Sequence, residues 1–334
     1  MKSAFIIAEA GVNHNGDFKQ AQRLVDLAKE SGADAVKFQS FRAGALVTEQ
    51  AQKAVYQKKN SNPRESQYQM LKKLELSEDQ HRMLKVYCQR RKIIFLSSPF
   101  DLQSLEFLLD LGVSKVKLAS SEINHLPLLR KAGASGKEII LSTGMAELKE
   151  VKQAISVLVA SGLAKEKITV LHCHTQYPTV PEDVNLLAIP TMKKELGVKV
   201  GFSDHTMGIE FSVAAVALGA VMIEKHLTSD RRLEGPDHQA SLEPKEFKQM
   251  VTAIRNICRG MGDGIKRPSR RELVIRKVAR KSIVAAFDIR KGDVFSEENL
   301  TIKRPEQGLS PMLWDRVLNR VAKKGFKKDD FIEV

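Results

Sequence analysis

Short runs of aliphatic and β-branched residues alternate with longer amphipathic stretches, and this alternation constrains the fold more than any other feature of the chain. The runs span residues 4–10, 35–41, 93–99, 114–120, 138–143, 168–174, 198–203 and 220–227. Strands separated by helices predict parallel βαβ units. Eight such units over roughly 250 residues are typical of a closed barrel. We therefore predict an α/β fold, a (β/α)8 TIM barrel over residues 1–260.

Three segments fall outside this regular pattern. The gap between residues 41 and 93 is too long for one helix, so we predict an insertion over residues 47–76 before a helix at 79–91. Glycine and charged residues predict a linker over residues 261–279. Strand-like runs at 281–286 and 300–304, a short helix at 310–317 and a final turn and strand at 323–334 predict a small C-terminal domain over residues 280–334. A domain of this size is marginally stable alone, so we expect it to dock on a barrel.

Composition favours a cytoplasmic protein without membrane or nucleic-acid partners. No apolar run approaches the roughly 20 residues of a membrane helix. Cys88, Cys173 and Cys258 are too few and too widely spaced for a disulfide framework or a CxxC metal site. The net charge is +14, but basic and acidic residues are mixed and no nucleic-acid motif accompanies them. An anionic small substrate or a solvated surface explains the excess equally well.

Polar side chains stand at the ends of all eight runs. A parallel barrel carries its chemistry at the carboxyl ends of its strands. The residues at these ends include Glu9, Lys37, Gln39, Ser98, Lys117, Ser120, Ser142, Ser203, His205, Glu224 and His226. Eight consecutive polar ends, several of them interrupting apolar runs, predict an active site at one mouth of the barrel.

Two lysines are embedded in apolar strands and predict an anion site. Lys37 lies in Ala-Val-Lys-Phe-Gln and Lys117 in Val-Lys-Leu-Ala-Ser. Burial of an ammonium is costly unless it meets an anion. With the neighbouring serines, the lysines could hold phosphate and carboxylate groups. Alternatively, each lysine pairs with a structural carboxylate such as Glu9 or Glu122.

Two histidines at neighbouring strand ends predict a divalent-metal site. His205 lies in Ser-Asp-His-Thr and His226 in Glu-Lys-His-Leu-Thr. Two imidazoles with carboxylates and open positions suit a catalytic ion such as Mn²⁺ better than a closed zinc site. Glu9, Glu224 and Asp237 are candidate acid–base groups or substrate contacts.

Taken in order, the motifs of the chain resemble the sialic acid synthase family nearly from end to end. They lie at residues 9–17, 36–39, 97–101, 117–122, 141–145, 171–179, 201–206, 224–226 and 235–244. The segment from 279 to 305 resembles the family's antifreeze-like (SAF) C-terminal domain. The resemblance implies metal-dependent condensation of phosphoenolpyruvate with N-acetylmannosamine or a related acylated amino sugar. The products are a nine-carbon nonulosonic acid and phosphate.

The resemblance also implies roles for individual residues. His205 and His226 ligate the metal, which is Mn²⁺ or another divalent ion such as Mg²⁺ or Co²⁺, and Glu9 and Asp237 join them as catalytic groups. The phosphoenolpyruvate site is implied to consist of Lys37, Ser98, Lys117, Ser120, Ser142 and Ser203. The sugar site is implied to consist of Gln39, Tyr177, Asp237 and Arg304. Arg304 reaches the acyl group from the partner subunit of a domain-swapped homodimer.

Three rival functions differ in substrate or in chemistry. An N,N'-diacetyllegionaminate synthase uses a 2,4-diacetamido-6-deoxymannose acceptor, and the same motifs serve it. An aldolase or a 3-deoxy-aldulosonate phosphate synthase is disfavoured, because a second phosphate cradle is missing and the C-terminal module is present. A non-catalytic sugar-binding barrel is disfavoured because Glu9, both lysines and both histidines are intact.

Overall fold

The protein divides into two compact units, each with a hydrophobic core of its own. The structure is a computed structural model that describes residues 3–62 and 64–334. The units are Met1–Asp263 and Gly264–Val334. The core of the first packs helices against a sheet, and the core of the second is a smaller cluster that includes Ile283, Phe295 and Phe326.

The first unit is a parallel barrel. Within its described residues, eight strands form one sheet in the order β3-β2-β1-β8-β7-β6-β5-β4, and each hydrogen-bonded neighbour is parallel. Strands β3 and β4 lie in contact and close the sheet. The strands are β1 (Phe5–Gly11), β2 (Ala35–Ser40), β3 (Ile94–Pro99), β4 (Lys115–Leu118), β5 (Glu138–Ser142), β6 (Ile168–Cys173), β7 (Lys199–Asp204) and β8 (Met222–His226). The predicted (β/α)8 fold is confirmed.

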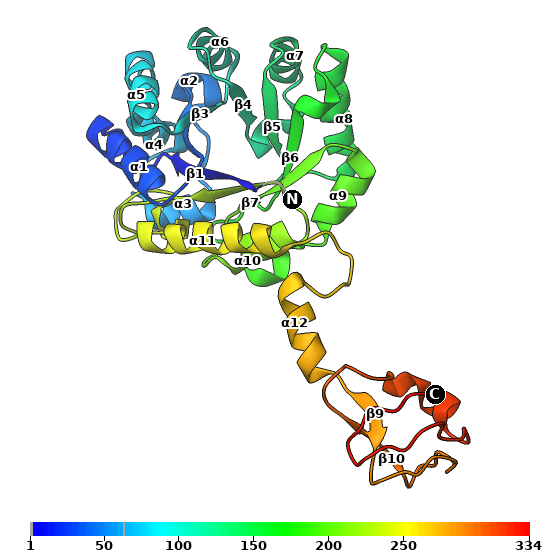
Figure 1. The fold of residues 1–334 in the computed structure, drawn as a ribbon. Coiled ribbons are helices and arrows are strands. Elements are labelled where there is room, and N and C mark those ends of the chain that lie inside the picture. Colours follow the sequence, from blue (N-terminus) through cyan, green and yellow to red (C-terminus); the bar gives the residue numbers. More distant parts are fainter. Residues whose placement is uncertain (1–2, 63) are drawn as a thin grey trace. The chain divides into compact units, whose positions relative to one another are not determined.

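Helices surround the strands on the outside (Figure 1). Side-chain caps fix where several begin. The Asp17 carboxylate accepts a hydrogen bond from Lys19 N at 2.7 Å, and Ser77 and Gln80 form a reciprocal capping box. The helices are α1 (Phe18–Glu30), α5 (Glu78–Arg91), α6 (Leu102–Asp110), α7 (Leu126–Ala134), α8 (Leu148–Ala160), α9 (Ala188–Leu196), α10 (Glu210–Ala217) and α11 (Pro244–Gly260). No helix in the described part of the chain is long and apolar enough to span a membrane.

Shorter helices fill the connections between these elements. The predicted insertion, residues 47–76, contains α3 (Val55–Asn60) and α4 (Gln67–Leu74), and α2 (Ala43–Leu46) directly precedes it. The 3-10 turns of the first unit are η1 (Ser120–Asn124), η2 (Lys165–Lys167), η3 (Pro181–Asp183) and η4 (His238–Ala240). Because η1 closely follows β4, it holds Ser120 and Ser121 in the cavity at the barrel mouth, and η4 begins directly after the cavity residue Asp237.

Apolar and polar side chains occupy successive layers inside the barrel. The apolar layer is formed by Ile7, Ala35, Leu96, Ile140, Leu171 and Met222. Two residues further along the same strands stand Glu9, Lys37, Ser98, Ser142, Cys173 and Glu224. Side chains two positions apart on a strand share one face. The polar layer therefore lies directly over an apolar floor, at the carboxyl ends of the strands.

The second unit begins with a helix and continues into a small β-module. Helix α12 (Arg270–Ala279) lies within the predicted linker. Strands β9 (Ser282–Ala285) and β10 (Leu300–Lys303) pair antiparallel, and η5 (Pro311–Leu313) and α13 (Trp314–Val317) follow. The strand predicted within 323–334 is wrong, because Phe326 and Phe331 make only isolated bridges there. Turn residues separate these two bridge positions along the chain, so no continuous ladder forms.

A buried ion pair fixes the last two strands on the side away from the barrel interior. Lys225 Nζ lies 3.0 Å from Asp204 Oδ2, and both side chains are fully buried. Thr206 and Ser212 donate further hydrogen bonds to this carboxylate. Lys225 also donates to the Thr206 carbonyl at 2.6 Å. Because both charges are paired and hydrogen-bonded, the pair stabilises the strand ends that carry His205 and His226.

Lys225→Met should lower the free energy of unfolding of the barrel by about 3–5 kcal/mol, since it leaves the Asp204 carboxylate buried without its cation. Equilibrium urea unfolding followed by circular dichroism measures the change. Lys199→Met is the matched control on β7. Lys199 is exposed and its ammonium donates to the Glu166 carbonyl, so we expect a change within about 0.5 kcal/mol. A similarly small loss for Lys225→Met would contradict the assigned role of the pair.

Candidate active site

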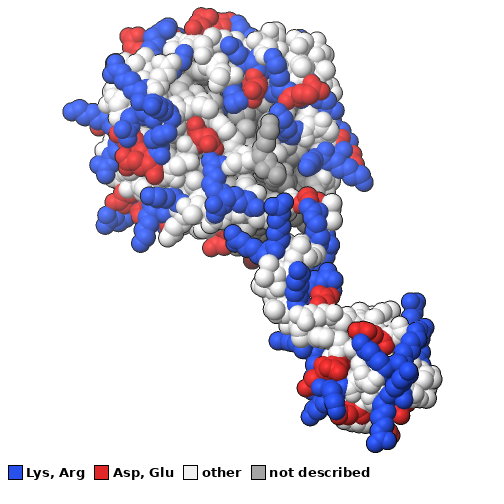
Figure 2. All heavy atoms as spheres, in the orientation of Figure 1, with Lys and Arg blue, Asp and Glu red and all other residues white. Residues whose placement is uncertain are grey.

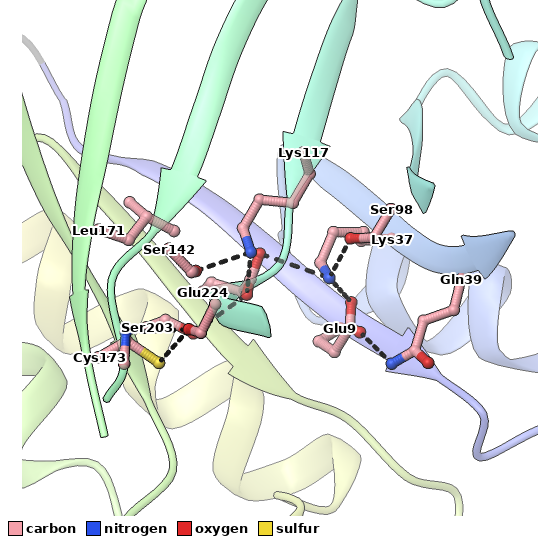
Figure 3. A network of polar contacts seen from close by, with 12 residues as sticks. Glu9, Lys37, Gln39, Ser98, Lys117, Ser142, Leu171, Cys173, Ser203 and Glu224 are labelled. Carbon is pink, nitrogen blue, oxygen red and sulfur yellow. Dashed lines mark hydrogen bonds and ion pairs between the residues drawn. The ribbon is translucent and has the colours of Figure 1, made fainter. Parts of the chain in front are cut away.

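Four buried charges form a cluster over the apolar floor (Figure 3). Lys37 Nζ lies 2.9 Å from Glu9 Oε2 and 3.8 Å from Glu224 Oε2. Lys117 Nζ lies 3.3 Å from Glu224 Oε1. Two positive and two negative groups balance, so the cluster as a whole is neutral when all four are ionised. Charged groups this deeply buried persist only when each meets an opposite charge.

Hydroxyl groups complete the surroundings of the two lysines. Lys37 donates to Ser98 Oγ at 3.1 Å, and Lys117 donates to Ser142 Oγ at 2.8 Å. Ser203 donates to Glu224 Oε1 at 3.0 Å. Both arrangements considered from the sequence therefore occur together. Each lysine lies against a carboxylate, and each also donates a hydrogen bond to a serine. Glu122 is not such a partner, because its carboxylate lies 2.7 Å from His125 Nδ1.

Burial and charge shift the pKa values of the cluster in different directions. Burial raises the pKa of Glu9 to about 7, although Lys37 opposes the shift. Burial also acts to raise the pKa of Glu224, but Lys117 and Lys37 outweigh it and hold the value below normal. Burial lowers the pKa of Lys117. One carboxyl therefore titrates near neutrality while its neighbour stays ionised, which is typical of catalytic pairs.

The two predicted metal ligands lie side by side. The His205 and His226 rings are 5.4 Å apart between centroids, and the Tyr177 ring lies 4.1 Å from that of His205. His205 Nδ1 contacts the His174 carbonyl at 2.5 Å, which orients the ring. His226 Nδ1 is buried and has no hydrogen-bond partner among the residues that the structure describes, with Asp237 Oδ2 at 3.8 Å. A buried imidazole nitrogen without a partner is suited to a ligand such as a cation.

The remaining predicted residues divide between the two units. Gln39 donates to Glu9 Oε1 at 3.3 Å, and Ser120 accepts a hydrogen bond from Gly144 N at 3.0 Å. Burial raises the pKa of Asp237 to about 6. These residues line one cavity of about 500 Å³ together with Lys37, Ser98, Lys117, Ser142, Tyr177, Ser203, His205, Glu224 and His226. Arg304 belongs to the second unit, where it is exposed directly after β10.

Several residues of the cavity escaped the sequence analysis. Tyr56 of the insertion stacks on Tyr177 with 5.1 Å between ring centroids. Cys173 Sγ lies 3.7 Å from Ser120 Oγ and 3.8 Å from His205 Nδ1. The position of Cys173, two residues after Leu171 on the inward face of β6, is a signal that could have found it. No comparable periodic signal marks Tyr56.

Among the residues that the structure describes, no group of three or more His, Cys, Asp or Glu side chains is arranged to hold a metal ion. The two imidazoles can supply two protein ligands, and any further ligands would come from water or substrate. The unpartnered His226 Nδ1 and the nearby Asp237 carboxylate fit such an ion chemically. The residues present are therefore compatible with the predicted divalent cation.

The fold and the cavity define an enzyme of the parallel-barrel class whose site carries balanced buried charges at the strand ends. Family models assign the chain more narrowly. The NeuB family matches residues 24–266 and the SAF domain matches residues 280–333. The chain therefore belongs to the NeuB, or sialic acid synthase, family.

Individual relatives agree with this assignment. The chain is 50% identical to the N,N'-diacetyllegionaminic acid synthase of Campylobacter jejuni over 99% of both chains. It is 46% identical to the enzyme of the same name from Legionella pneumophila, over 92% of this chain and 87% of the relative. A crystal structure of the N-acetylneuraminic acid synthetase of Leptospira borgpetersenii superposes with a TM-score of 0.72 at 35% identity, covering 82% and 90% of the two chains.

The stability of the metal-free barrel should fall by about 2.5 kcal/mol between pH 5 and pH 8 through Glu9 alone. The folded pKa of about 7 exceeds the unfolded value of 4.5. The folded state therefore binds more protons in this window, and stability is lost as the pH rises through 7. Glu9→Gln removes the titration and should flatten the dependence by that amount. Urea unfolding at both pH values, with chelator present, measures it.

Glu49→Gln is the control for this experiment, because Glu49 is an exposed residue of the same barrel. Its free energy of unfolding should keep the wild-type pH dependence. A Glu9→Gln variant that also keeps the wild-type dependence would show that Glu9 titrates in the folded state as it does in the unfolded chain.

Proposed function

We propose that the protein condenses phosphoenolpyruvate with an acylated amino sugar to give a nonulosonic acid and inorganic phosphate. The observation that carries the proposal is the pair of buried lysines, each hydrogen-bonded to a serine at a strand end. The acceptor is N-acetylmannosamine or, alternatively, 2,4-diacetamido-6-deoxymannose. The names of two relatives, both N,N'-diacetyllegionaminic acid synthases, support the alternative.

The lysine side of the cavity is suited to phosphoenolpyruvate. The phosphate and carboxylate each need charged or hydroxyl donors. We assign these donors to Lys37, Lys117 and the four serines Ser98, Ser120, Ser142 and Ser203, all of which line the cavity. On the visible outer surface, by contrast, Lys and Arg are interspersed with Asp and Glu (Figure 2). The proposed anion site is an interior feature, since both lysine side chains are buried.

The reaction balances with the residues present. C3 of the enolpyruvate bonds to the aldehyde carbon of the open-chain sugar, whose oxygen takes up a proton. Positive charge then develops at C2, where water adds and loses a proton. The C2–O bond to phosphate then breaks, and the new C2 hydroxyl loses its proton to the departing phosphate and becomes the keto group of the product. Glu9, with a pKa of about 7, can hold or release a proton near neutral pH, and Glu224 stays ionised beside the developing positive charge.

The histidine side of the cavity is assigned to the metal and the sugar. His205 and His226 would hold Mn²⁺ or another divalent ion such as Mg²⁺ or Co²⁺. When bound, such an ion supplies Lewis-acid polarisation of the sugar aldehyde. Gln39, Tyr177 and Asp237 would contact the sugar hydroxyls. With a pKa raised to about 6, Asp237 can also exchange a proton close to neutrality.

We further propose a cytoplasmic homodimer with exchanged caps. Residues 1–260 form the catalytic barrel, 261–279 the linker and 280–334 the cap, and Arg304 of the partner subunit completes the sugar site. The linker helix α12 supports association, because its apolar side chains Leu273, Val274, Ile275 and Val278 are 44%, 70%, 60% and 64% exposed. The three cysteines, all buried free thiols, are consistent with the cytoplasm.

Lys37→Met or Lys117→Met should raise the KM for phosphoenolpyruvate far more than the KM for the sugar. Loss of a charged hydrogen-bond partner typically costs about 2–5 kcal/mol. Phosphate release from phosphoenolpyruvate, measured with Mn²⁺ and a panel of acylated amino sugars, tests both the proposed function and this effect. Lys115→Met on β4 is the control, since its ammonium pairs with Glu138 outside the cavity. Unchanged phosphoenolpyruvate affinity in both cavity variants would show that the lysines are structural.

Exchange of the caps should restore activity when two inactive variants are co-expressed. Arg304→Ala has an intact barrel and a defective cap. His226→Ala has a defective barrel and an intact cap. With random pairing and exchanged caps, roughly a quarter of all sites receive both sound parts. The assay is phosphate release, with mixed dimers confirmed by mass. The test requires that Arg304→Ala alone is strongly impaired. Recovery no greater than that of the parents would rule out the exchange.

A further inference from the structure

One wall of the cavity is apolar and comes from a segment outside the barrel repeat. We call residues 43–76, which contain α2, α3 and α4, the insertion wall. The side chains by which it lines the cavity include Leu46, Val47, Tyr56, Met70, Leu71 and Leu74. The strand ends, by contrast, line the same cavity with lysine, glutamate, serine and histidine. The cavity therefore has two sides of opposite chemical character.

The insertion wall is held in place before any ligand binds. Met70, Leu71 and Leu74 are buried in a cluster with Val12 and Phe41, separate from the main core. A capping box of Ser66 and Gln69 fixes the start of α4. The segment is closed at its ends by a hydrogen bond of 2.7 Å from Ala43 N to Glu75 Oε1. A preformed wall loses little conformational entropy when a ligand binds, so differences in contact between ligands are expressed as differences in affinity.

The insertion wall also reaches the proposed catalytic groups. The Tyr56 ring stacks on Tyr177 at an interplanar angle of 27°, and Tyr177 in turn lies against His205. Asn60 at the end of α3 accepts a hydrogen bond from Gly235 N at 3.2 Å and donates to the Pro236 carbonyl at 3.3 Å. Gly235 and Pro236 directly precede Asp237 in the chain. The wall therefore borders the side of the cavity assigned to the sugar.

The two candidate acceptors differ in the groups that such a wall can recognise. N-acetylmannosamine carries hydroxyls at C4 and C6. A hydroxyl buried against aliphatic side chains without a hydrogen-bond partner is strongly disfavoured. The 2,4-diacetamido-6-deoxy sugar instead presents an acetamido methyl at C4 and a methyl at C6. These groups gain from contact with apolar surface, and Gln57 and Gln67 add amide groups to the same wall.

We propose that the insertion wall is the specificity determinant for the acceptor and selects a 6-deoxy sugar that carries an acylamino group at C4 and whose C6 is a methyl group. The inference rests on the proposed condensation and identifies which acceptor it uses. Val47 and Tyr56 are its test positions, because both are only partly buried and tolerate substitution better than the core residues Met70 and Leu74.

The experiment compares kcat/KM for 2,4-diacetamido-6-deoxymannose and N-acetylmannosamine at saturating phosphoenolpyruvate and Mn²⁺. We expect the wild type to favour the first acceptor by at least about 10-fold, the scale on which apolar pockets discriminate single methyl-sized groups. Val47→Thr, nearly isosteric but polar, should lower kcat/KM for the first acceptor by about 10-fold and leave that for the second nearly unchanged. The KM for phosphoenolpyruvate should change by less than about 2-fold, because the anion side is untouched.

Thr48→Val is the matched control, the reverse exchange at the exposed neighbouring position outside the cavity. It should keep the wild-type preference. A second pair of variants guards against misfolding at one site: Tyr56→Phe should retain the preference, and Tyr56→Ala should reduce it. The inference is overturned if the wild type uses N-acetylmannosamine equally well or better, or if Val47→Thr and Tyr56→Ala both leave the preference unchanged. Failure to turn over either acceptor would instead contradict the proposed function itself.

Discussion

The apolar floor inside the barrel is the feature on which the active site depends. Ile7, Leu96 and Leu171 exclude water from below, and the residues two positions later on each strand meet in the space above them. In that setting a lone ammonium or carboxylate is unstable, so Lys37 is stabilised as an ion by two carboxylates, Glu9 at 2.9 Å and Glu224 at 3.8 Å. The same exclusion of water raises the pKa of Glu9 and lowers that of Lys117. The strand period of two thus determines both the stability of the site and its electrostatics.

Charge balance connects the cluster to its ligands. The charges of the two lysines and two glutamates cancel when the site is empty. Phosphoenolpyruvate, which carries a phosphate and a carboxylate, would therefore add negative charge that no group of the cluster balances. Positive charge must then be gained at the site. Glu9 can take up a proton, since its pKa of about 7 is close to neutrality, and the proposed cation beside His205 and His226 can supply the remainder. Under the proposed function, substrate binding and metal binding would therefore support each other electrostatically.

Much of the barrel and of its strand-end groups could be predicted, because both follow from local periodicity. Lys37 and Lys117 stand out in apolar runs, and His205 and His226 end neighbouring strands, which places their rings together. The wall residue Tyr56 could not be predicted in this way, since the insertion has no repeat that fixes it relative to a strand. The strand expected near Phe331 also failed, because turns interrupt the pattern and leave single bridges. Likewise, no local pattern in the sequence specifies where Arg304 lies relative to a barrel.

Under the proposed function, the two reactants are recognised by different parts of the chain: phosphoenolpyruvate by the strand ends and the sugar by the insertion wall. The anion side is made by strands whose register must be kept for the sheet to close, whereas the wall is a single segment between β2 and α5. A change of length or composition in that segment leaves the register of every strand pair intact. Evolution could therefore exchange one sugar acceptor for another by remodelling the insertion wall, while the carbon–carbon bond-forming chemistry is inherited unaltered. Such a division gives a lineage of enzymes a short mutational route to new sugar acceptors.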